Sequence, residues 1–414
     1  MVYDAIVVGG GPAGATAARL LGQSGVSTLL IDKSSFPRDK PCGGGISARV
    51  LNRFPYLRDA LRGIPVHYVS KVYFESPAGI ALDYASPDPL YLMVRRVDFD
   101  QLLHTLARPR VDSVTALVRK ITFSDSEVRV EAEADASGES RTYRAKMILG
   151  CDGANSVAAR AAGLRSGNVR HQYAIDMMEE TPYESLDISD RDRMYVYYGF
   201  EGNFGYSYVF PKTSHVNLGL GCKLDFYLAS HRGEHYPRHR AFVDRLISNR
   251  LLAGSSRRDC FRAFPLPISG PLPRTFADRV LLAGDAGGFV NAFTAEGIYF
   301  AMVSGDHAAR AAVAALRAGD FSVAQLSAYQ RNWKTEIGGD LSTSLAVQRL
   351  LISDLSRVDR LVTRAQHRSS FADLLARYTT GALSLAQFKK SVLLRELPFY
   401  LAEKLRGGMW PAAR

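Results

Sequence analysis

Three glycines near the start of the chain have the spacing of a phosphate-binding turn. Gly9, Gly11 and Gly14 follow an apolar run over residues 5–8, and a second apolar run ends at Asp32. The first glycine permits a tight turn, the second lets the backbone approach a pyrophosphate, and the third lets helix and strand pack closely. The N-terminus of the next helix offers unpaired N–H groups to the phosphates, and Asp32 can accept a hydrogen bond from a ribose hydroxyl. Since the turn lies between two strand-like runs, the sequence predicts a dinucleotide site.

A second segment, far along the chain, indicates which dinucleotide is bound. Residues 279–302 read RVLLAGDAGGFVNAFTAEGIYFAM, an apolar strand followed by Gly284-Asp285 and by a helix that we expect from Thr294. The segment resembles flavoproteins related to p-hydroxybenzoate hydroxylase and geranylgeranyl reductase, in which the Gly-Asp pair contacts the ribityl chain of FAD. Residues 96–103 (RVDFDQLL) resemble the R-x-x-F-D-x-x-L signature beside FAD, and residues 151–156 (CDGANS) resemble the Asp-Gly motif near FAD and NAD(P)H. Four motifs in this order imply FAD.

A glycine-rich loop narrows the resemblance to one family. Residues 36–47 read FPRDKPCGGGIS, and three consecutive glycines let a backbone press against a flat ring. The loop is similar to the P-C-G-G-G loop that the geranylgeranyl reductase family carries beside the isoalloxazine, and residues 284–298 resemble that family's GDAAGFVNPLTGEGI. The resemblance covers about residues 1–310. It implies FAD-dependent reduction of C=C bonds in a polyprenyl chain of a lipid, quinone or pigment precursor, with a hydrophobic isoprenoid as substrate.

The sequence departs from the family at positions that bear on the substrate. The family motif Y-x-W-x-F-P appears as YSYVFP over residues 206–211, with Tyr208 where Trp is usual. Ala292 replaces the proline, and Ala295 the glycine, of the loop before the helix. A different aromatic residue in the channel changes which isoprenoid or aromatic group fits.

The catalytic candidates follow from the chemistry of alkene reduction. An isolated double bond is a poor hydride acceptor, so the protein must supply a tight approach and a proton source. Cys42 is the one side chain of the glycine loop able to act as that acid or to orient it, and apolar packing is the alternative. Tyr206 and Tyr208 can line the channel, although aromatic alternation on a strand is also ordinary sheet packing.

The residues expected to hold the cofactor come from the four motifs and the glycine loop. The resemblance assigns non-covalent FAD binding to Gly9, Gly11, Pro12, Ala13, Gly14, Asp32, Lys33, Cys42, Gly43, Gly44, Gly45, Arg96, Val118, Asp152, Gly284, Asp285, Gly297 and Ile298. With a single dinucleotide fingerprint, the electron donor stays open between NADPH and a ferredoxin. No metal site is expected, because the four cysteines form no C-x-x-C pair.

Composition and charge limit where the protein works. No apolar run reaches the roughly 18–20 residues that span a bilayer, and no signal peptide is visible, so we expect a cytoplasmic protein. Residues 343–414 hold twelve Lys/Arg against five Asp/Glu, which is most of the net charge of +11. Basic helices interleaved with Leu, Phe, Tyr and Trp suit the anionic surface of the cytoplasmic membrane, or else are ordinary solvated helices. No nucleic-acid motif accompanies the charge, and the oligomeric state stays open, a monomer being compatible.

The motifs are so widely spread that the FAD domain must be assembled from separate pieces. We expect an α/β fold whose discontinuous Rossmann-type FAD domain, of the glutathione-reductase-like kind, comprises residues 1–65, 94–165 and 275–330. Residues 66–93 and 166–274, with β-branched and aromatic runs, are expected to form an inserted antiparallel β-sheet substrate domain. Apolar residues at three- and four-residue spacing predict a basic helical region over residues 331–414.

Two other functions compete with prenyl reduction. An FAD-dependent monooxygenase or halogenase acting on an aromatic compound shares these motifs. Against it, Gly287-Gly288 stand where many hydroxylases have Ala-His, and the halogenase motif W-x-W-x-I-P is absent. A flavoprotein electron carrier to quinone usually needs an iron–sulfur cysteine cluster, which four scattered cysteines do not provide.

Overall fold

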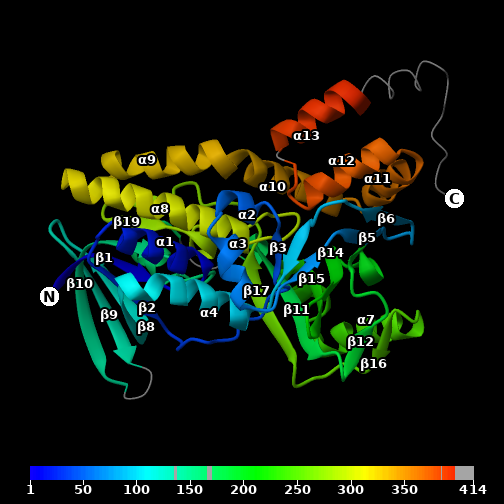
Figure 1. The fold of residues 1–414 in the computed structure, drawn as a ribbon, viewed down its shortest axis with the longest axis horizontal. Helices are drawn as coiled ribbons and strands as arrows, with labels where there is room; N and C mark the ends of the chain where they lie inside the picture. Colours follow the sequence, from blue (N-terminus) through cyan, green and yellow to red (C-terminus); the bar gives the residue numbers. More distant parts are fainter. Residues whose placement is uncertain (135–137, 166–169, 384, 397–414) are drawn as a thin grey trace.

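Two large β-sheets and the helices that cover them make up the fold of this computed structural model (Figure 1). The structure describes residues 1–134, 138–165, 170–383 and 385–396. Within these residues each large sheet has seven strands. The predicted α/β class with a helical C-terminal region is confirmed.

The first sheet carries the glycine turn at the carboxyl end of a central strand. In pairing order its strands are β1 (Val2–Val8), β2 (Thr28–Asp32), β8 (Asp112–Phe123), β9 (Val128–Ala134), β10 (Ser140–Gly150), β19 (Val280–Leu282) and β18 (Phe276–Ala277). β1 pairs in parallel with both β2 and β10, and β19 adds to β10 in parallel. Ile6, Leu30 and Ile148 are fully or almost fully buried in these strands, as expected of parallel strands covered on both faces.

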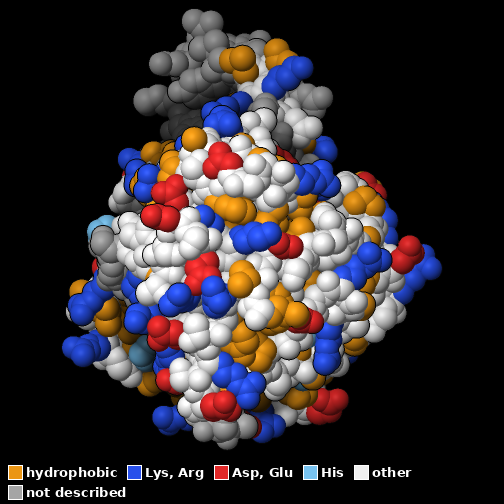
Figure 2. Space-filling model, turned by 90° about the vertical axis from the view of Figure 1, so that its left-hand side faces the viewer, with side chains coloured by type: hydrophobic (Ala, Val, Ile, Leu, Met, Phe, Trp, Pro, Cys, Tyr) orange, Lys and Arg blue, Asp and Glu red, His pale blue; other side chains and the backbone are white. Residues whose placement is uncertain are grey.

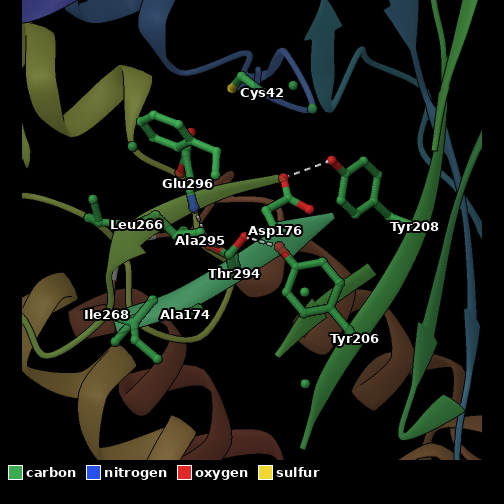
Figure 3. Close-up of a pocket in the computed structure, with 18 of the residues that line it drawn as sticks. Cys42, Ala174, Asp176, Tyr206, Tyr208, Leu266, Ile268, Thr294, Ala295 and Glu296 are labelled. Carbon is green, nitrogen blue, oxygen red and sulfur yellow. Dashed lines mark hydrogen bonds between the residues drawn. The ribbon is translucent and has the colours of Figure 1, made fainter. Parts of the chain in front are cut away.

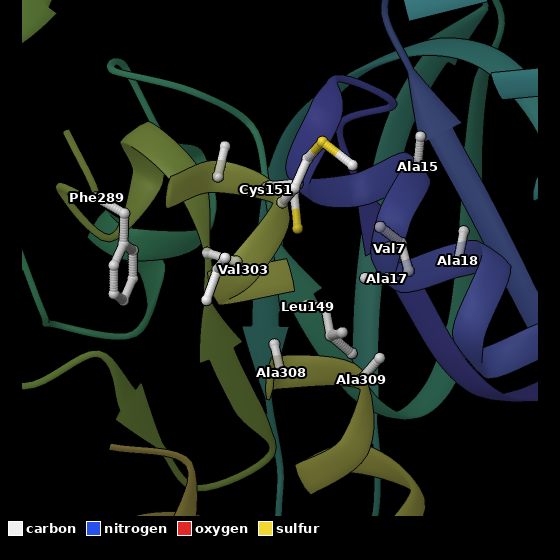
Figure 4. Packing of buried hydrophobic residues seen from close by; sticks show 14 of the residues in the cluster. Val7, Ala15, Ala17, Ala18, Leu149, Cys151, Phe289, Val303, Ala308 and Ala309 are labelled. Atoms are coloured by element: carbon white, nitrogen blue, oxygen red, sulfur yellow. The ribbon is translucent and has the colours of Figure 1, made fainter. Parts of the chain in front are cut away.

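Small residues let two helices pack closely beside this sheet. α1 (Pro12–Gln23) begins directly after the glycine turn, and α8 (Ile298–Ala318) packs against it. Figure 4 shows the alanines of both helices close to Val7 and Leu149 of the sheet. A Cβ atom on Gly305 of α8 would lie 2.3 Å from the carbonyl oxygen of Ala13. The glycine therefore sets how near α8 can come to the turn.

The helix predicted from Thr294 begins four residues later, at Ile298, so that prediction was wrong. Ala295 has a φ of 55°, in the left-handed region, which a right-handed helix cannot contain. The intervening residues form a turn in which the Asn291 side chain accepts hydrogen bonds from the N–H groups of Phe293 and Thr294.

The second sheet draws its strands from residues 71–85 and 173–267. In pairing order they are β17 (Phe261–Pro267), β11 (Tyr173–Pro182), β15 (His215–Lys223), β14 (Gly205–Pro211), β13 (Arg193–Tyr198), β5 (Lys71–Glu75) and β6 (Ala81–Ala85). β13 and β5 are parallel, and the other neighbours are antiparallel. A small sheet of β3 (Gly45–Ser47), β7 (Tyr91–Met93) and β4 (His67–Val69) continues from the glycine loop.

The C-terminal helices reach the junction between the two sheets. α9 (Val323–Trp333) is followed by a π-helical turn and by α10 (Gly339–Ile352), whose Gln348 donates a hydrogen bond of 2.7 Å to the carbonyl of Ala292. α11 (Ser356–His367) and α12 (Ser369–Thr379) contact β6, and their apolar side chains share a buried cluster with those of β5 and β6. α13 (Leu385–Ser391) projects from the body in Figure 1, and its Phe388 ring stacks on Tyr378 of α12. Among the described helices, none combines the length and the apolar character needed to cross a bilayer.

Candidate active site

A cavity lies between the glycine loop, the second sheet and the turn before α8 (Figure 3), with an empty volume of about 1320 Å³ that includes solvent at its open side. Much of its wall is apolar or aromatic, including Phe264, Leu266, Ile268 and Phe293. The residues predicted from the sequence that line it are Pro12, Cys42, Gly43, Gly44, Gly45, Arg96, Tyr206, Tyr208, Asp285, Gly297 and Ile298. The fold therefore brings three separate motifs and all three catalytic candidates into one space.

The glycine turn offers backbone N–H groups with open space in front of them. Gly11 is the N-cap of α1, and no described side chain caps that helix end. A Cβ atom on Gly9 or Gly14 would overlap backbone atoms at 2.4 Å and 1.7 Å. One on Gly11 would meet only the Arg38 guanidinium, at 3.5 Å, among the described residues. Packing thus explains Gly9 and Gly14 but not Gly11. The space at Gly11 fits a pyrophosphate lying against the helix N-terminus.

Asp32 is oriented by the turn itself. Its two carboxylate oxygens accept hydrogen bonds from the N–H groups of Gly10 at 2.6 Å and Ser34 at 2.9 Å. The Arg38 guanidinium lies 3.9 Å from Asp32 and 3.0 Å from Asp100. A carboxylate has about four acceptor sites, so the partly exposed Asp32 keeps capacity for the predicted ribose hydroxyl.

Other predicted cofactor residues are held by local contacts outside the cavity wall. Val118 is 7% exposed in the apolar layer of the first sheet, and Lys33 is exposed. The Asp152 carboxylate accepts hydrogen bonds from two N–H groups at the start of α5 (Val157–Ala161) and therefore caps that helix. Gly284 has a φ of 61° and lies against Ala13, so a close approach to α1 explains this glycine.

Two of the three loop glycines, Gly43 and Gly44, lie so close to the surrounding protein that a side chain would not fit without a shift. A Cβ atom on Gly43 would lie 3.0 Å from the Phe210 ring, and one on Gly44 would lie 2.1 Å from the Val94 carbonyl oxygen. Gly44 also has a φ of 68°, which favours glycine. The loop backbone is therefore pressed onto the second sheet while still lining the cavity.

A buried charge network supports the same loop. Lys212, only 2% exposed, forms an ion pair with Glu180, which also accepts a hydrogen bond of 2.6 Å from Arg95. Asn217 donates to Glu180 and to the Cys42 carbonyl oxygen, at 3.1 Å and 3.2 Å. Burial opposes the ionisation of Glu180, but Lys212 and Arg95 outweigh it and lower the pKa of Glu180 to about 2. Sequence reasoning missed this network, for which Lys212 directly after YSYVFP was the available signal.

Cys42 and Arg96 lie together at the loop end of the cavity. The Cys42 sulfur accepts a hydrogen bond of 3.4 Å from the Gly44 N–H. Arg96 is buried and donates two hydrogen bonds, of 2.7 Å and 2.6 Å, to Asp100. Burial opposes the charge of Arg96, yet Asp100 and a hydrogen bond with the Cys42 thiol raise its pKa above the usual value. A permanent positive charge therefore lies beside the thiol.

Asp176 on β11 is a titratable group in the cavity that sequence reasoning missed. One carboxylate oxygen accepts a hydrogen bond of 3.1 Å from the Tyr208 hydroxyl, whereas Oδ1 is buried without a hydrogen-bond partner among the described residues. Burial raises the pKa of Asp176 to about 6, against the lowering effects of Tyr208 and His239. Tyr206 donates instead to the Thr294 carbonyl at 2.6 Å. Burial raises the pKa values of both tyrosines well above the usual value.

Comparison with known proteins identifies relatives of this chain. A family model described as an FAD binding domain matches residues 2–335. The chain is 32% identical to a chloroplastic geranylgeranyl diphosphate reductase of Oryza sativa, over 74% of this chain but 66%, just under two thirds, of that protein. It is 24% identical to a digeranylgeranylglycerophospholipid reductase of Methanococcus vannielii, over 94% of this chain and 98% of that protein. The crystal structure of a geranylgeranyl bacteriochlorophyll reductase-like protein from Thermoplasma acidophilum has the same fold, with a TM-score of 0.80 and 23% identity over 97% of this chain and 98% of that one.

Proposed function

This chain belongs to the geranylgeranyl reductase family of FAD-binding flavoproteins, and we propose that it reduces C=C double bonds in a polyprenyl chain of the geranylgeranyl type. One observation carries the proposal: a single cavity joins the cofactor motifs, the catalytic candidates and an apolar wall. When bound and reduced, FAD supplies the hydride for such a reaction.

The chain's own residues bind and orient the cofactor. The N-terminus of α1 at Gly11 would hold the pyrophosphate, Asp285 would contact the ribityl chain, and the glycine loop would face the ring. Lys40 lies 3.6 Å from Asp285 and adds a positive charge at this end of the cavity. These contacts are non-covalent, in line with the motifs that predict them.

The remaining cavity wall suits a prenyl chain. An alkene offers no polar group to hold, so it must be bound by shape and by apolar contact. The hydroxyl of Tyr206 is occupied by the Thr294 carbonyl, so this residue can offer its ring to a substrate. Phe210 packs on Tyr208 with ring centroids 4.4 Å apart. Cys42 remains a candidate for the proton donor or for a group that orients it, with apolar packing as the alternative.

Anaerobic reoxidation tests the proposed function. We expect enzyme reduced with dithionite to be reoxidised by geranylgeranyl diphosphate without O₂, one flavin for each double bond reduced, with a product two mass units heavier per bond. Rapid O₂ consumption with an aromatic compound, and no anaerobic reoxidation by the prenyl compound, would instead favour the monooxygenase or halogenase. Mass spectrometry of lipids and quinones from cells with and without the gene would then identify the natural substrate.

We also propose that the enzyme works in the cytoplasm on the anionic surface of the membrane, where a polyprenyl substrate is stored. In α13 and the turn after it, Leu393 and Leu394 are 59% and 63% exposed, and Lys389 and Lys390 are exposed beside them. Figure 2 is turned about the vertical axis, so α13 lies at the top there as it does in Figure 1. Basic and hydrophobic side chains lie next to one another in that part of Figure 2. Further residues predicted for this contact, Phe399, Tyr400, Leu401 and Trp410, lie outside the described residues.

Liposome co-sedimentation at low and high salt tests membrane binding. Each Lys near such a surface contributes about 1 kcal/mol, so a Lys389→Gln, Lys390→Gln double variant should bind anionic vesicles about 30-fold more weakly. The matched control is an Arg119→Gln, Lys120→Gln variant in β8, whose side chains are 57% and 62% exposed and far from α13 in Figure 1. Equal binding to neutral and anionic vesicles, or none to either, would contradict the proposal.

A further inference from the structure

The carboxyl groups that line the cavity differ in whether a cation neutralises them. In the described part of the chain these are Asp176, Asp285 and Glu296. Lys40 lies 3.6 Å from Asp285, and Arg49 lies 3.1 Å from Glu296. Asp176 has no ion pair within 4 Å among the described residues. Its Oδ1 atom is buried without a hydrogen-bond partner there. A carboxyl group without a cation is the one best suited to hold a proton.

We propose that the Asp176 carboxyl group is the acid that protonates the substrate alkene, and that Tyr208 is the positioning residue that holds it. The inference rests on the proposed function. Figure 3 shows Asp176 between the Cys42 loop and the two tyrosines, with its hydrogen bond to Tyr208 drawn as a dashed line.

The proton and electrons of this step balance. One alkene carbon gains a hydride, whose two electrons come from the reduced flavin that the proposed function requires. The π pair of the alkene forms the C–H bond at the other carbon, using the proton of Asp176. The carboxyl O–H bond breaks, and the Asp176 carboxylate recovers a proton from water after product release.

The surroundings of Asp176 explain how it can carry that proton. The titratable groups that interact electrostatically with Asp176 are Tyr206 and Tyr208 of β14, Cys222 of β15 and His239 of α7 (His235–Ser248). The other titratable or charged groups on its cavity wall, among the described residues, are Lys40, Cys42, Tyr91, Arg96, Lys223, Asp285 and Glu296. His239 lowers the pKa of Asp176, but this effect is smaller than that of burial. The His239 Nε2 atom is buried and lies 3.1 Å from the carboxylate of Glu179 rather than beside Asp176. A prenyl chain that displaces water from the cavity would further disfavour the carboxylate.

Cys42 is the alternative proton donor, and its contacts favour an orienting role. Its sulfur accepts the Gly44 N–H and interacts with the Arg96 guanidinium, so both neighbours act as donors toward it. Asp176, by contrast, accepts a hydrogen bond from only one donor among the described residues, the uncharged Tyr208 hydroxyl. The carboxyl group is therefore the better source of a proton at this place.

Three variants test the assignment in the full-length, FAD-loaded enzyme. Asp176→Asn keeps the shape of the side chain and should slow substrate-dependent reoxidation by about 10²–10⁴-fold, with FAD content unchanged. Tyr208→Phe removes a donor that stabilises the carboxylate, so it should raise the pKa of Asp176. Asp187→Asn is the control and should react like the wild type, because this carboxylate has a 44% exposed side chain, pairs with Arg191 and does not line the cavity.

The pH dependence gives a signed expectation. The acid must be protonated, so the wild-type rate should fall as pH rises through the pKa of Asp176. Tyr208→Phe should move this fall to higher pH, and Asp176→Asn should lose it. Infrared spectroscopy gives a readout without turnover: a carbonyl band of a protonated carboxyl group should titrate in the wild type, disappear in Asp176→Asn and titrate at higher pH in Tyr208→Phe.

The outcomes separate this inference from the function on which it rests. A wild-type enzyme that never reacts with a prenyl substrate would overturn the proposed function. Turnover of Asp176→Asn at the wild-type rate, with the wild-type pH profile, would overturn only the assignment of the acid. An infrared spectrum that is the same for Asp176→Asn and the wild type would also overturn it, because Asp176 would then hold no proton.

Discussion

Replacing Gly11 by valine separates cofactor binding from folding. The residue has φ −68° and ψ −173°, which valine adopts without strain, and the nearest atom to a new Cβ is the mobile end of Arg38 at 3.5 Å. Replacing a glycine at the N-cap lowers the free energy of unfolding by about 1 kcal/mol. Valine also restricts the unfolded chain, which raises the free energy of unfolding by about 0.4–1 kcal/mol. We therefore expect the free energy of unfolding of the apo-protein to change by less than about 1 kcal/mol.

Cofactor binding should respond very differently to the same change. The valine side chain would occupy the space against the α1 N-terminus and separate the pyrophosphate from two backbone N–H donors. A charge-assisted hydrogen bond contributes about 1.5–3 kcal/mol, so two lost bonds weaken binding by about 3–6 kcal/mol. This corresponds to a loss of FAD affinity of about 10²–10⁴-fold.

The assay compares Gly11→Val with Gly14→Ala. A Cβ atom on Gly14 would lie 1.7 Å from the Gly9 carbonyl oxygen, so this control should lose about 3 kcal/mol or more of stability. The ratio of flavin to protein absorbance after purification, calorimetric titration of the apo-protein with FAD, and urea unfolding measure the two effects separately. Gly11→Val that purifies with full flavin, or that unfolds as readily as Gly14→Ala, would refute the reasoning.

Three further outcomes are expected. Acid precipitation should release all the FAD into the supernatant, and flavin that stays in the pellet would reveal a covalent bond. Cys42→Ala should keep its FAD and slow reoxidation less than Asp176→Asn does, whereas a loss of about 10²–10⁴-fold would make the thiol the acid. Glu180→Gln should cost about 3–5 kcal/mol in urea unfolding because it leaves the buried Lys212 unpaired, while Lys212→Met should cost less because Glu180 keeps Arg95. The pKa of Glu180 is depressed to about 2, so its contribution is present above its ordinary pKa and is lost as pH falls toward 2, a loss that Glu180→Gln should not show.

Local backbone requirements made much of the site predictable from the sequence. A glycine turn between two strands, a ring-facing glycine loop and Gly284-Asp285 each depend on residues that are adjacent in the chain. Their order implied FAD and the α/β fold, and the structure places residues of all three segments on the cavity. The ends of helices were less predictable. Ala295 has a φ of 55°, so α8 begins only at Ile298, and an alanine gives no sign in the sequence that its backbone is left-handed.

Tertiary structure alone decided which side chains complete the site. Asp176 lies between Ile175 and Met177, so the sequence does not show which face of this strand points to the cavity. The pairing of β11 with β15 and β17 decides it. Glu180 meets Lys212 across 32 residues, and Gln348 of α10 meets Ala292 across 56. Such partners are set by strand register and helix packing rather than by spacing along the chain, because side chains on neighbouring strands come within contact distance whatever their separation in sequence. The sequence by itself thus determined the cofactor and the class of fold, and the packing of distant segments decided where the charges and the acid of the cavity lie.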